Sequence, residues 1–230
     1  MLQFERQAWE QGYRRLAGID EAGRGPLAGP VVAAALVFER AFVEAEQYES
    51  LQGVTDSKRL TETQRETFYE LLIASPHVAV GLGVADVGEI DELNILRATH
   101  LAMRRAVISL ATAPDFALVD GLPVPGLPVP SLAIVGGDGR SLSIAAASII
   151  AKVTRDRHMR DLDRDYPDYG FARHKGYGTR AHTEALLRYG PTPLHRRTFQ
   201  PVADALRIRA RRAAAPPPPE QTSRPRRKAP

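Results

Sequence analysis

The sequence contains no cysteine, which excludes disulfide bonds and zinc sites built from cysteine. A chain without disulfides tolerates a reducing compartment, and we expect a cytoplasmic protein. Long apolar runs are also missing, because the longest, Val31–Phe38, is too short to span a bilayer. The polar segment Met1–Arg15 lacks the apolar core of a signal peptide. We therefore expect no membrane partner.

Charge is distributed unevenly along the 230 residues, whose net charge is +4. Residues 1–139 carry 11 basic and 19 acidic side chains, a net charge of −8, whereas residues 140–200 carry 12 and 6, a net charge of +6. An acidic half followed by a basic half fits a site where one half holds cations and the other a polyanion. Two ordinary solvated surfaces would give the same pattern, so charge leaves both interpretations open.

Alternating strand and helix patterns predict an α/β fold with a mixed sheet, followed by a helical C-terminal section. The expected helices are 61–73, opened by a capping box at Thr61, and then 91–110, 144–165 and 179–189. The expected strands are Leu16–Asp20, Val31–Phe38, Val78–Val84, Pro114–Asp120 and Leu132–Val135. Two copies of Gly-Leu-Pro-Val-Pro at 121–130 predict an extended connector between the last two strands.

One catalytic domain is expected over residues 1–206, of which 140–206 form the mainly helical, basic part. Residues 207–230 are rich in Ala, Pro and Arg, with eight basic side chains against one acidic, and predict a disordered basic tail. Such a tail is consistent with nonspecific affinity for nucleic acid, and equally with solubility alone. No heptad pattern is present, so we expect a monomer.

Carboxylates follow three of the predicted strands: Asp20 with Glu21, Asp120 and Asp138. Strand ends are where sites gather in open α/β sheets, and oxygen ligands suit Mg²⁺ or Mn²⁺ in a two-metal phosphoryl-transfer site. Adjacent strand residues face opposite sides, so Asp20 and Glu21 reach one ion only if the strand breaks there, as Gly23 would allow. Otherwise Glu21 contributes through its carbonyl or a water. Each acid alone also fits a turn.

Six motifs, in order from about Leu16 to Pro201, resemble the ribonuclease HII family. Those at 18–26 and 174–179 are specific together, whereas Asp-Ser-Lys alone would be weak. The motifs are Gly18-Ile-Asp-Glu-Ala-Gly-Arg-Gly-Pro26, Asp56-Ser-Lys58, Leu93-Asn-Ile-Leu96, Val119-Asp-Gly121, Ala145-Ala-Ala-Ser-Ile-Ile-Ala-Lys-Val-Thr-Arg-Asp156 and His174-Lys-Gly-Tyr-Gly-Thr179.

The resemblance implies a ribonuclease H-like fold, with a central mixed five-stranded sheet flanked by helices. It also implies hydrolysis of the RNA strand of RNA–DNA hybrids, and incision 5′ of single ribonucleotides embedded in duplex DNA. The products would carry 3′-hydroxyl and 5′-phosphate ends, and the cofactor would be Mg²⁺ or Mn²⁺. By motif position it assigns the catalytic metal site to Asp20, Glu21, Asp120 and Asp138.

The same resemblance assigns recognition of the ribose 2′-hydroxyl to the backbone of Gly23, Arg24 and Gly25, and packing on the adjoining deoxyribose to Tyr177. The 2′-hydroxyl distinguishes RNA from DNA at one position, so its reader must approach closely and offer hydrogen bonds. For each of these residues alone, an ordinary turn is the alternative.

Basic residues beside these motifs are candidates for phosphate contacts, with a solvated surface as the alternative: Lys58, Lys152 and Arg155. His174 and His182 are expected to be structural or to bind backbone. Where the family commonly has Lys-Gly-Asp, this chain has Gly136-Gly137-Asp138, so one positive charge beside the fourth carboxylate is missing.

Two other functions remain open from the residues. A junction resolvase of the same superfold would share the carboxylates without the Gly23–Gly25 segment. A non-catalytic module would hold hybrid duplex through the basic half, but unneutralised carboxylates repel phosphate and disfavour it.

Overall fold

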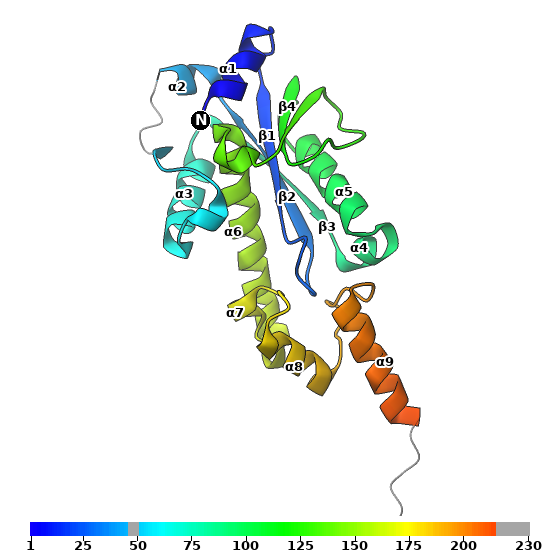
Figure 1. Cartoon of the computed structure of the whole chain (residues 1–230). Helices are drawn as coiled ribbons and strands as arrows, with labels where there is room; N and C mark the ends of the chain where they lie inside the picture. Colours follow the sequence, from blue (N-terminus) through cyan, green and yellow to red (C-terminus); the bar gives the residue numbers. More distant parts are fainter. Residues whose placement is uncertain (46–50, 215–230) are drawn as a thin grey trace, which may run out of the picture.

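A mixed five-stranded sheet in the order β3-β2-β1-β4-β5 forms the centre of the computed structural model, which describes residues 1–45 and 51–214 (Figure 1). β1 pairs antiparallel with β2 and parallel with β4, while β2–β3 is antiparallel and β4–β5 parallel. The predicted α/β class and mixed sheet are confirmed. The strands are β1 (Leu16–Ala22), β2 (Val31–Phe38), β3 (Val78–Ala85), β4 (Phe116–Asp120) and β5 (Ser131–Ile134).

Helices cover both faces of the sheet, which explains why every residue of β2 is buried. On one face, Leu36 and Phe38 pack with α6 and α3; on the other, Ala35 and Val37 pack with α5. The longer helices are α3 (Glu62–Ala74), α5 (Ile95–Ile108), α6 (Leu142–Asp165) and α9 (Gln200–Ala214). The shorter ones are α1 (Gln3–Glu10), α2 (Arg40–Glu44), α4 (Val87–Leu93), α7 (Phe171–His174) and α8 (Arg180–Tyr189), with 3₁₀ turns η2 (Ser57–Arg59), η3 (Gly137–Gly139) and η4 (Pro167–Tyr169).

At two glycines the backbone of a helix lies in direct contact with the backbone of a strand. A Cβ at Gly18 would overlap the carbonyl carbon of Ser143, so α6 lies directly on β1, two residues from Asp20. A Cβ at Gly83 would overlap the carbonyl oxygen of Ala102, so α5 lies equally close to β3. The first contact brings α6 to the end of β1, where the acidic residues gather.

Helix boundaries differ from the predictions at three places. The helix expected over 91–110 is instead two helices, because Asn94 has a φ of 71° and its side chain accepts hydrogen bonds from the amides of Leu96 and Arg97 at the start of α5. The helix expected from Ile144 begins at Leu142 with Ser141 as its cap. The capping box at Thr61 is confirmed.

The third difference concerns the C-terminus. Helix α9 continues to Ala214, so the disorder predicted for residues 207–214 is wrong, because these residues are helical. Residues 215–230, where the rest of the predicted disordered tail falls, lie outside the described part of the chain.

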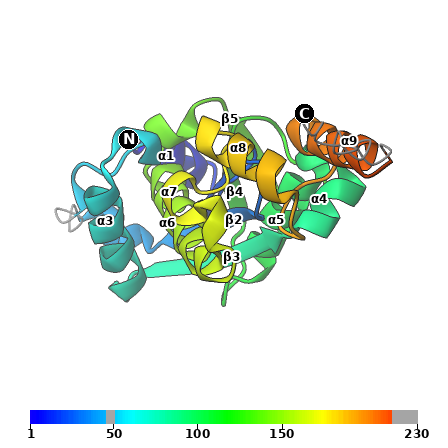
Figure 2. The same cartoon turned by 90° about the horizontal axis from the view of Figure 1, so that it is seen from below.

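The C-terminal helices lie beyond one end of the sheet, and α9 lies on the same side as α4 in both views (Figures 1 and 2). The loop after β1 joins them to the sheet: Leu27 N–H donates to Gly176 O (2.8 Å), Arg196 N–H to Leu27 O (2.9 Å), and Gly29 N–H to Leu194 O (2.9 Å). Within the described ranges, no helix is both long enough and apolar enough to cross a membrane.

Candidate active site

Three carboxylates from separate parts of the chain converge at one edge of the sheet. Asp20 lies on β1, Asp120 ends β4 and Asp138 lies on η3, and one oxygen of each lies within 4.8 Å of the others. β1 and β4 are parallel neighbours, so their ends meet at the same edge. Gly137 N–H donates to Asp120 Oδ1 (2.7 Å), which holds η3 and therefore Asp138 against β4.

The cluster concentrates negative charge in a buried place. Asp20 is only 4% exposed, and burial, together with repulsion from Glu21 and Asp120, raises its pKa well above the ordinary value. Burial and repulsion from Asp120 and Asp56 also raise the pKa of Asp138. A divalent cation would relieve this repulsion, and three carboxylate oxygens at this spacing are the donors that Mg²⁺ and Mn²⁺ prefer. The residues present therefore fit a divalent metal ion.

Lys58 lies beside the cluster, with Nζ 3.7 Å from Asp138 Oδ2. Its side chain is 78% exposed, so the ammonium remains accessible to a ligand. The Asp56-Ser57-Lys58 segment is fixed in two ways: Asp56 accepts a hydrogen bond from the Lys58 amide (2.9 Å), and Ser57 Oγ accepts one from Ser148 Oγ (2.7 Å) on α6. A positive charge thus reaches Asp138 from a distant segment, although the neighbouring position 136 is glycine.

Glu21 lies beside this cluster rather than in it. β1 continues to Ala22, and the chain turns only at Gly23, whose φ is 98°, so the strand does not break at Asp20 as expected for two side chains aimed at one ion. Glu21 Oε1 instead accepts a hydrogen bond from Arg24 (3.1 Å), and its amide donates to Asp20 Oδ1 (2.7 Å). It lines two hollows, a cleft of about 530 Å³ and an adjacent pocket of about 100 Å³. Its metal role stays a prediction.

The cleft of about 530 Å³ is lined by Asp20 of the cluster and by most of the predicted substrate-binding residues. Tyr177 is 44% exposed at its edge, and a Cβ built on Gly25 would lie 3.6 Å from Tyr177 Cε1, so the ring faces the loop. Lys152 Nζ lies 6.0 Å from the Tyr177 ring centre and bonds Asp156 (2.8 Å). The cleft is lined by Asp20, Glu21, Ala22, Gly23, Arg24, Gly25, Ser57, Lys58, Arg65, Ser148, Lys152 and Tyr177.

Two kinds of residue at this cleft escaped sequence reasoning about the site. Ser57 and Ser148 belong to the Asp-Ser-Lys and Ala-rich motifs, whose spacing was a signal, but their mutual hydrogen bond joins residues far apart in the chain. Arg65 lines the cleft and donates to the carbonyls of Ser57 (2.8 Å) and Leu60 (2.6 Å), and nothing local in the sequence marks it.

Arg155 is neither a phosphate contact nor part of a solvated face, so both interpretations of it were wrong. It is buried, and its guanidinium donates to the carbonyls of Pro30 (2.9 Å), Lys175 (3.0 Å) and Ala28 (3.1 Å). The side chain holds the loop after β1 against α6.

The expectation for the histidines is confirmed. His174 Nε2 lies 2.8 Å from Tyr169 O, and His182 Nδ1 lies 2.9 Å from Tyr177 O. Burial lowers the pKa of both rings. They are backbone-binding groups of the C-terminal section.

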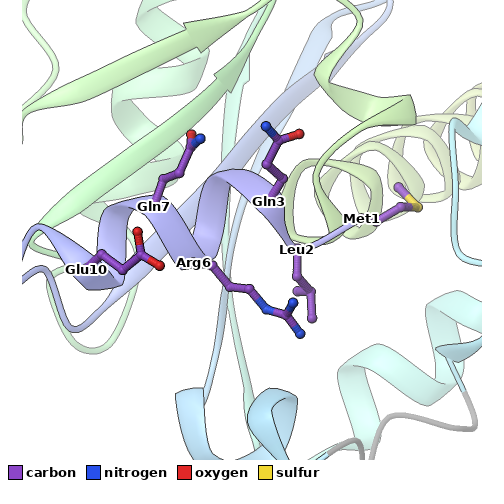
Figure 3. Close-up of a pocket in the computed structure, with 6 residues that line it drawn as sticks. All are labelled: Met1, Leu2, Gln3, Arg6, Gln7 and Glu10. Carbon is purple, nitrogen blue, oxygen red and sulfur yellow. The ribbon is translucent and has the colours of Figure 1, made fainter.

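Another hollow, of about 580 Å³, runs along α1 (Figure 3). It is lined by Met1, Leu2, Gln3, Arg6, Gln7 and Glu10, which do not include a member of the acidic cluster. Volume therefore does not identify the active site; the convergence of the carboxylates does.

The strand order, the acidic residues at the ends of two adjacent parallel strands, and the cleft beside them define a nuclease of the ribonuclease H-like class. The family model for ribonuclease HII matches residues 17–202. Ribonuclease HII of Chlamydia trachomatis serovar A is 56% identical over 203 residues, covering 88% of this chain and 90% of that protein. The chain belongs to the ribonuclease HII family and is an endoribonuclease of the ribonuclease H type.

Solved structures agree with this assignment. Ribonuclease H2 from Pyrococcus horikoshii has a TM-score of 0.69 and 32% identity, over 85% of this chain and 99% of that one. Bst-RNase HIII, solved in complex with Mn²⁺, has a TM-score of 0.66 and 20% identity over 89% of this chain and 73% of its own, and supports the fold. The predicted family and fold are confirmed, and the junction resolvase and non-catalytic alternatives are not favoured.

Proposed function

We propose that this endoribonuclease hydrolyses the RNA strand of RNA–DNA hybrids and incises 5′ of single ribonucleotides embedded in duplex DNA, in DNA replication or repair. The observation that carries the proposal is the position of the Gly23–Gly25 loop, which lines one cleft together with Asp20 of the acidic cluster and Tyr177. A nuclease that recognises one ribose needs the groups that bind this ribose close to the scissile phosphate. The Gly23–Gly25 loop meets this need, because it follows Asp20 and Glu21 closely in the chain.

We propose that Asp20, Asp120 and Asp138, with Glu21 at their edge, hold Mg²⁺ or Mn²⁺, with two ions in the reacting complex. Such ions supply activation of the attacking water and stabilisation of the leaving oxygen. The Mn²⁺ complex of Bst-RNase HIII makes manganese as reasonable to test as magnesium.

The groups around the cleft suit three tasks: binding the 2′-hydroxyl, packing on the adjoining deoxyribose and contacting phosphate. The glycine-rich loop offers backbone donors to the 2′-hydroxyl, and the Tyr177 ring tests whether a deoxyribose follows it. Lys58 is exposed next to Asp138 and can reach a phosphate beside the acids. Lys152 is held under Tyr177 by Asp156, which orients its ammonium toward the same cleft.

The decisive experiment compares duplex DNA containing one ribonucleotide, an RNA–DNA hybrid and an all-DNA four-way junction, each with Mg²⁺, Mn²⁺ or a chelator. We expect cleavage of the first two with either metal, with 5′-phosphate and 3′-hydroxyl ends mapped to the 5′ side of the ribonucleotide. Cleavage of the junction, or absence of cleavage of the single-ribonucleotide duplex, contradicts the proposal. The expected monomer stays a prediction, which light scattering of the purified protein would test.

A further inference from the structure

Two carbonyl groups of the Gly23–Gly25 loop, those of Gly23 and Arg24, point away from the cleft and toward one buried arginine. Arg196 is 0% exposed, and its guanidinium donates to Arg24 O through Nη1 (2.9 Å) and to Gly23 O through Nη2 (2.6 Å). Nε and Nη2 also donate to Gly29 O, at 3.0 and 2.8 Å. One side chain therefore holds three carbonyls across the loop from residue 23 to residue 29.

This arrangement determines where the loop amides point. In a trans peptide the carbonyl and the following N–H point in opposite directions. Because the carbonyls of Gly23 and Arg24 face Arg196, the N–H groups of Arg24 and Gly25 face the opposite side. Gly23, Arg24 and Gly25 line the cleft, whereas Arg196 does not. Among residues 1–45 and 51–214, neither amide has a backbone acceptor, and both residues are exposed, so the two donors are open to a ligand in the cleft.

A guanidinium suits this task better than other side chains. It presents five N–H donors in a rigid planar fork, so it can bind several carbonyls in one geometry, whereas an ammonium lacks that fork. Burial and repulsion from Arg155 lower the pKa of Arg196 to about 9, so the group is still charged at neutral pH. The Arg155 side chain packs directly against Gly23 and donates hydrogen bonds to the carbonyls of Pro30, Ala28 and Lys175.

We propose that Arg196 is the positioning residue for ribose recognition: by taking up the carbonyls of Gly23 and Arg24, it presents the amides of Arg24 and Gly25 to the 2′-hydroxyl. This inference rests on the proposed function, and it goes further by assigning the geometry of the reader to a residue outside the cleft. Arg196 does not line the cleft, and its side chain hydrogen-bonds to the carbonyls of Gly23, Arg24 and Gly29 rather than to the acidic cluster. Its loss therefore weakens recognition of ribose while leaving metal binding unchanged.

The test compares Arg196→Lys and Arg196→Ala with the wild type on duplex DNA containing one ribonucleotide. We expect the KM to rise at least about tenfold in both, because the unsupported amides lose their orientation. Mn²⁺ affinity measured by calorimetry should stay at the wild-type value. Millimolar methylguanidinium should lower the KM of Arg196→Ala part of the way toward the wild-type value. It should not lower the KM of Arg196→Lys, whose side chain still fills the site.

Arg105→Lys is the matched control, because Arg105 also donates to a backbone carbonyl, that of Val84 (2.6 Å), and to Glu89 (2.7 Å), but lies on α5 away from the loop. It should keep the wild-type KM. If the wild type fails to cleave the single-ribonucleotide duplex, the proposed function fails. If the wild type cleaves it and Arg196→Lys keeps its KM, or if both Arg196 variants lose Mn²⁺ affinity in parallel, only the positioning role is overturned.

A second measurement does not depend on the folding of the Arg196 variants. In an Asp120→Asn background, the amide NMR signals of Arg24 and Gly25 should shift when the single-ribonucleotide duplex is added, and shift less with the all-deoxy duplex of the same sequence. Equal shifts with both duplexes would overturn the inference even if no Arg196 variant folds.

Discussion

The loop after β1 contributes both to the cleft and to the stability of the fold, and a methyl group added at Gly25 or at Gly23 separates these two contributions. At Gly25 the new Cβ would have Tyr177 Cε1 as its neighbour, at 3.6 Å, an ordinary van der Waals distance. At Gly23 it would overlap the Arg155 side chain, and φ there is 98°, a conformation that L side chains rarely adopt. The first change alters the cleft, and the second alters the fold as well.

The expected magnitudes follow from these contacts. For Gly23→Ala, positive φ costs about 1–2 kcal/mol and overpacking about 1–3 kcal/mol, together about 2–5 kcal/mol. In a chain of this size the Tm should fall by roughly 4–20 °C. Gly25→Ala should change the stability by less than about 0.5 kcal/mol. Its methyl group occupies the space between the loop and Tyr177, so kcat/KM should fall at least about tenfold, or about 1.4 kcal/mol.

Thermal unfolding and steady-state cleavage of the single-ribonucleotide duplex measure the two effects separately. Gly88→Ala is the control, because Gly88 lies in α4, away from the loop, and a Cβ there would meet Asp86 Oδ1 at 3.3 Å. It should keep its activity, and its Tm should change far less than that of Gly23→Ala. Wild-type kcat/KM in Gly25→Ala would refute the assignment of ribose recognition to this loop. An unchanged Tm in Gly23→Ala would refute the packing of Arg155 against it.

Three further predictions concern the acids, the metal and pH. Asp120→Asn should abolish cleavage and leave the circular dichroism spectrum unchanged; retained activity would count against the site. Mn²⁺ at about 100 times its Kd should stabilise the wild type by about 2.7 kcal/mol and Asp120→Asn far less, and an equal Tm shift in both would place the ion elsewhere. His195 has its pKa lowered from 6.5 to about 4 by burial, then by His182, and its neutral Nδ1 accepts from Thr192 N–H (3.0 Å). His195 therefore binds a proton at higher pH in the unfolded chain than in the folded protein, and the free energy of unfolding should fall by about 3 kcal/mol between pH 6.5 and pH 4. Urea titrations at the two pH values measure this fall, and His195→Gln should give a smaller one. Equal stability of the wild type at both pH values would refute the prediction.

Local patterns were sufficient for the five strands, for helices α3, α6 and α8 and for the three acids that meet, but they did not predict α1, α2, α7 or α9. An apolar run predicts a buried strand wherever the chain places it, and β2 is buried throughout. Carboxylates after predicted strands indicate one edge of the sheet, where Asp20, Asp120 and Asp138 do meet. The motifs were also sufficient for the family, because they include the residues at the cleft. Asn94 shows the limit even for local structure: it divides one amphipathic pattern into two helices, since a single positive φ redirects the chain without changing its hydrophobic spacing.

Contacts between distant segments were decided only when the chain packed. Lys58 forms an ion pair with Asp138, 80 positions away in the chain, and Arg196 donates to the carbonyl of Gly23, 173 positions away. In the sequence Arg155 and Arg196 resemble other basic residues of a positively charged half, yet in the structure both are buried. The physical reason is that hydrophobic spacing records which face of an element is buried, whereas the partner of a polar group depends on which backbone lies opposite it after the helices close on the sheet.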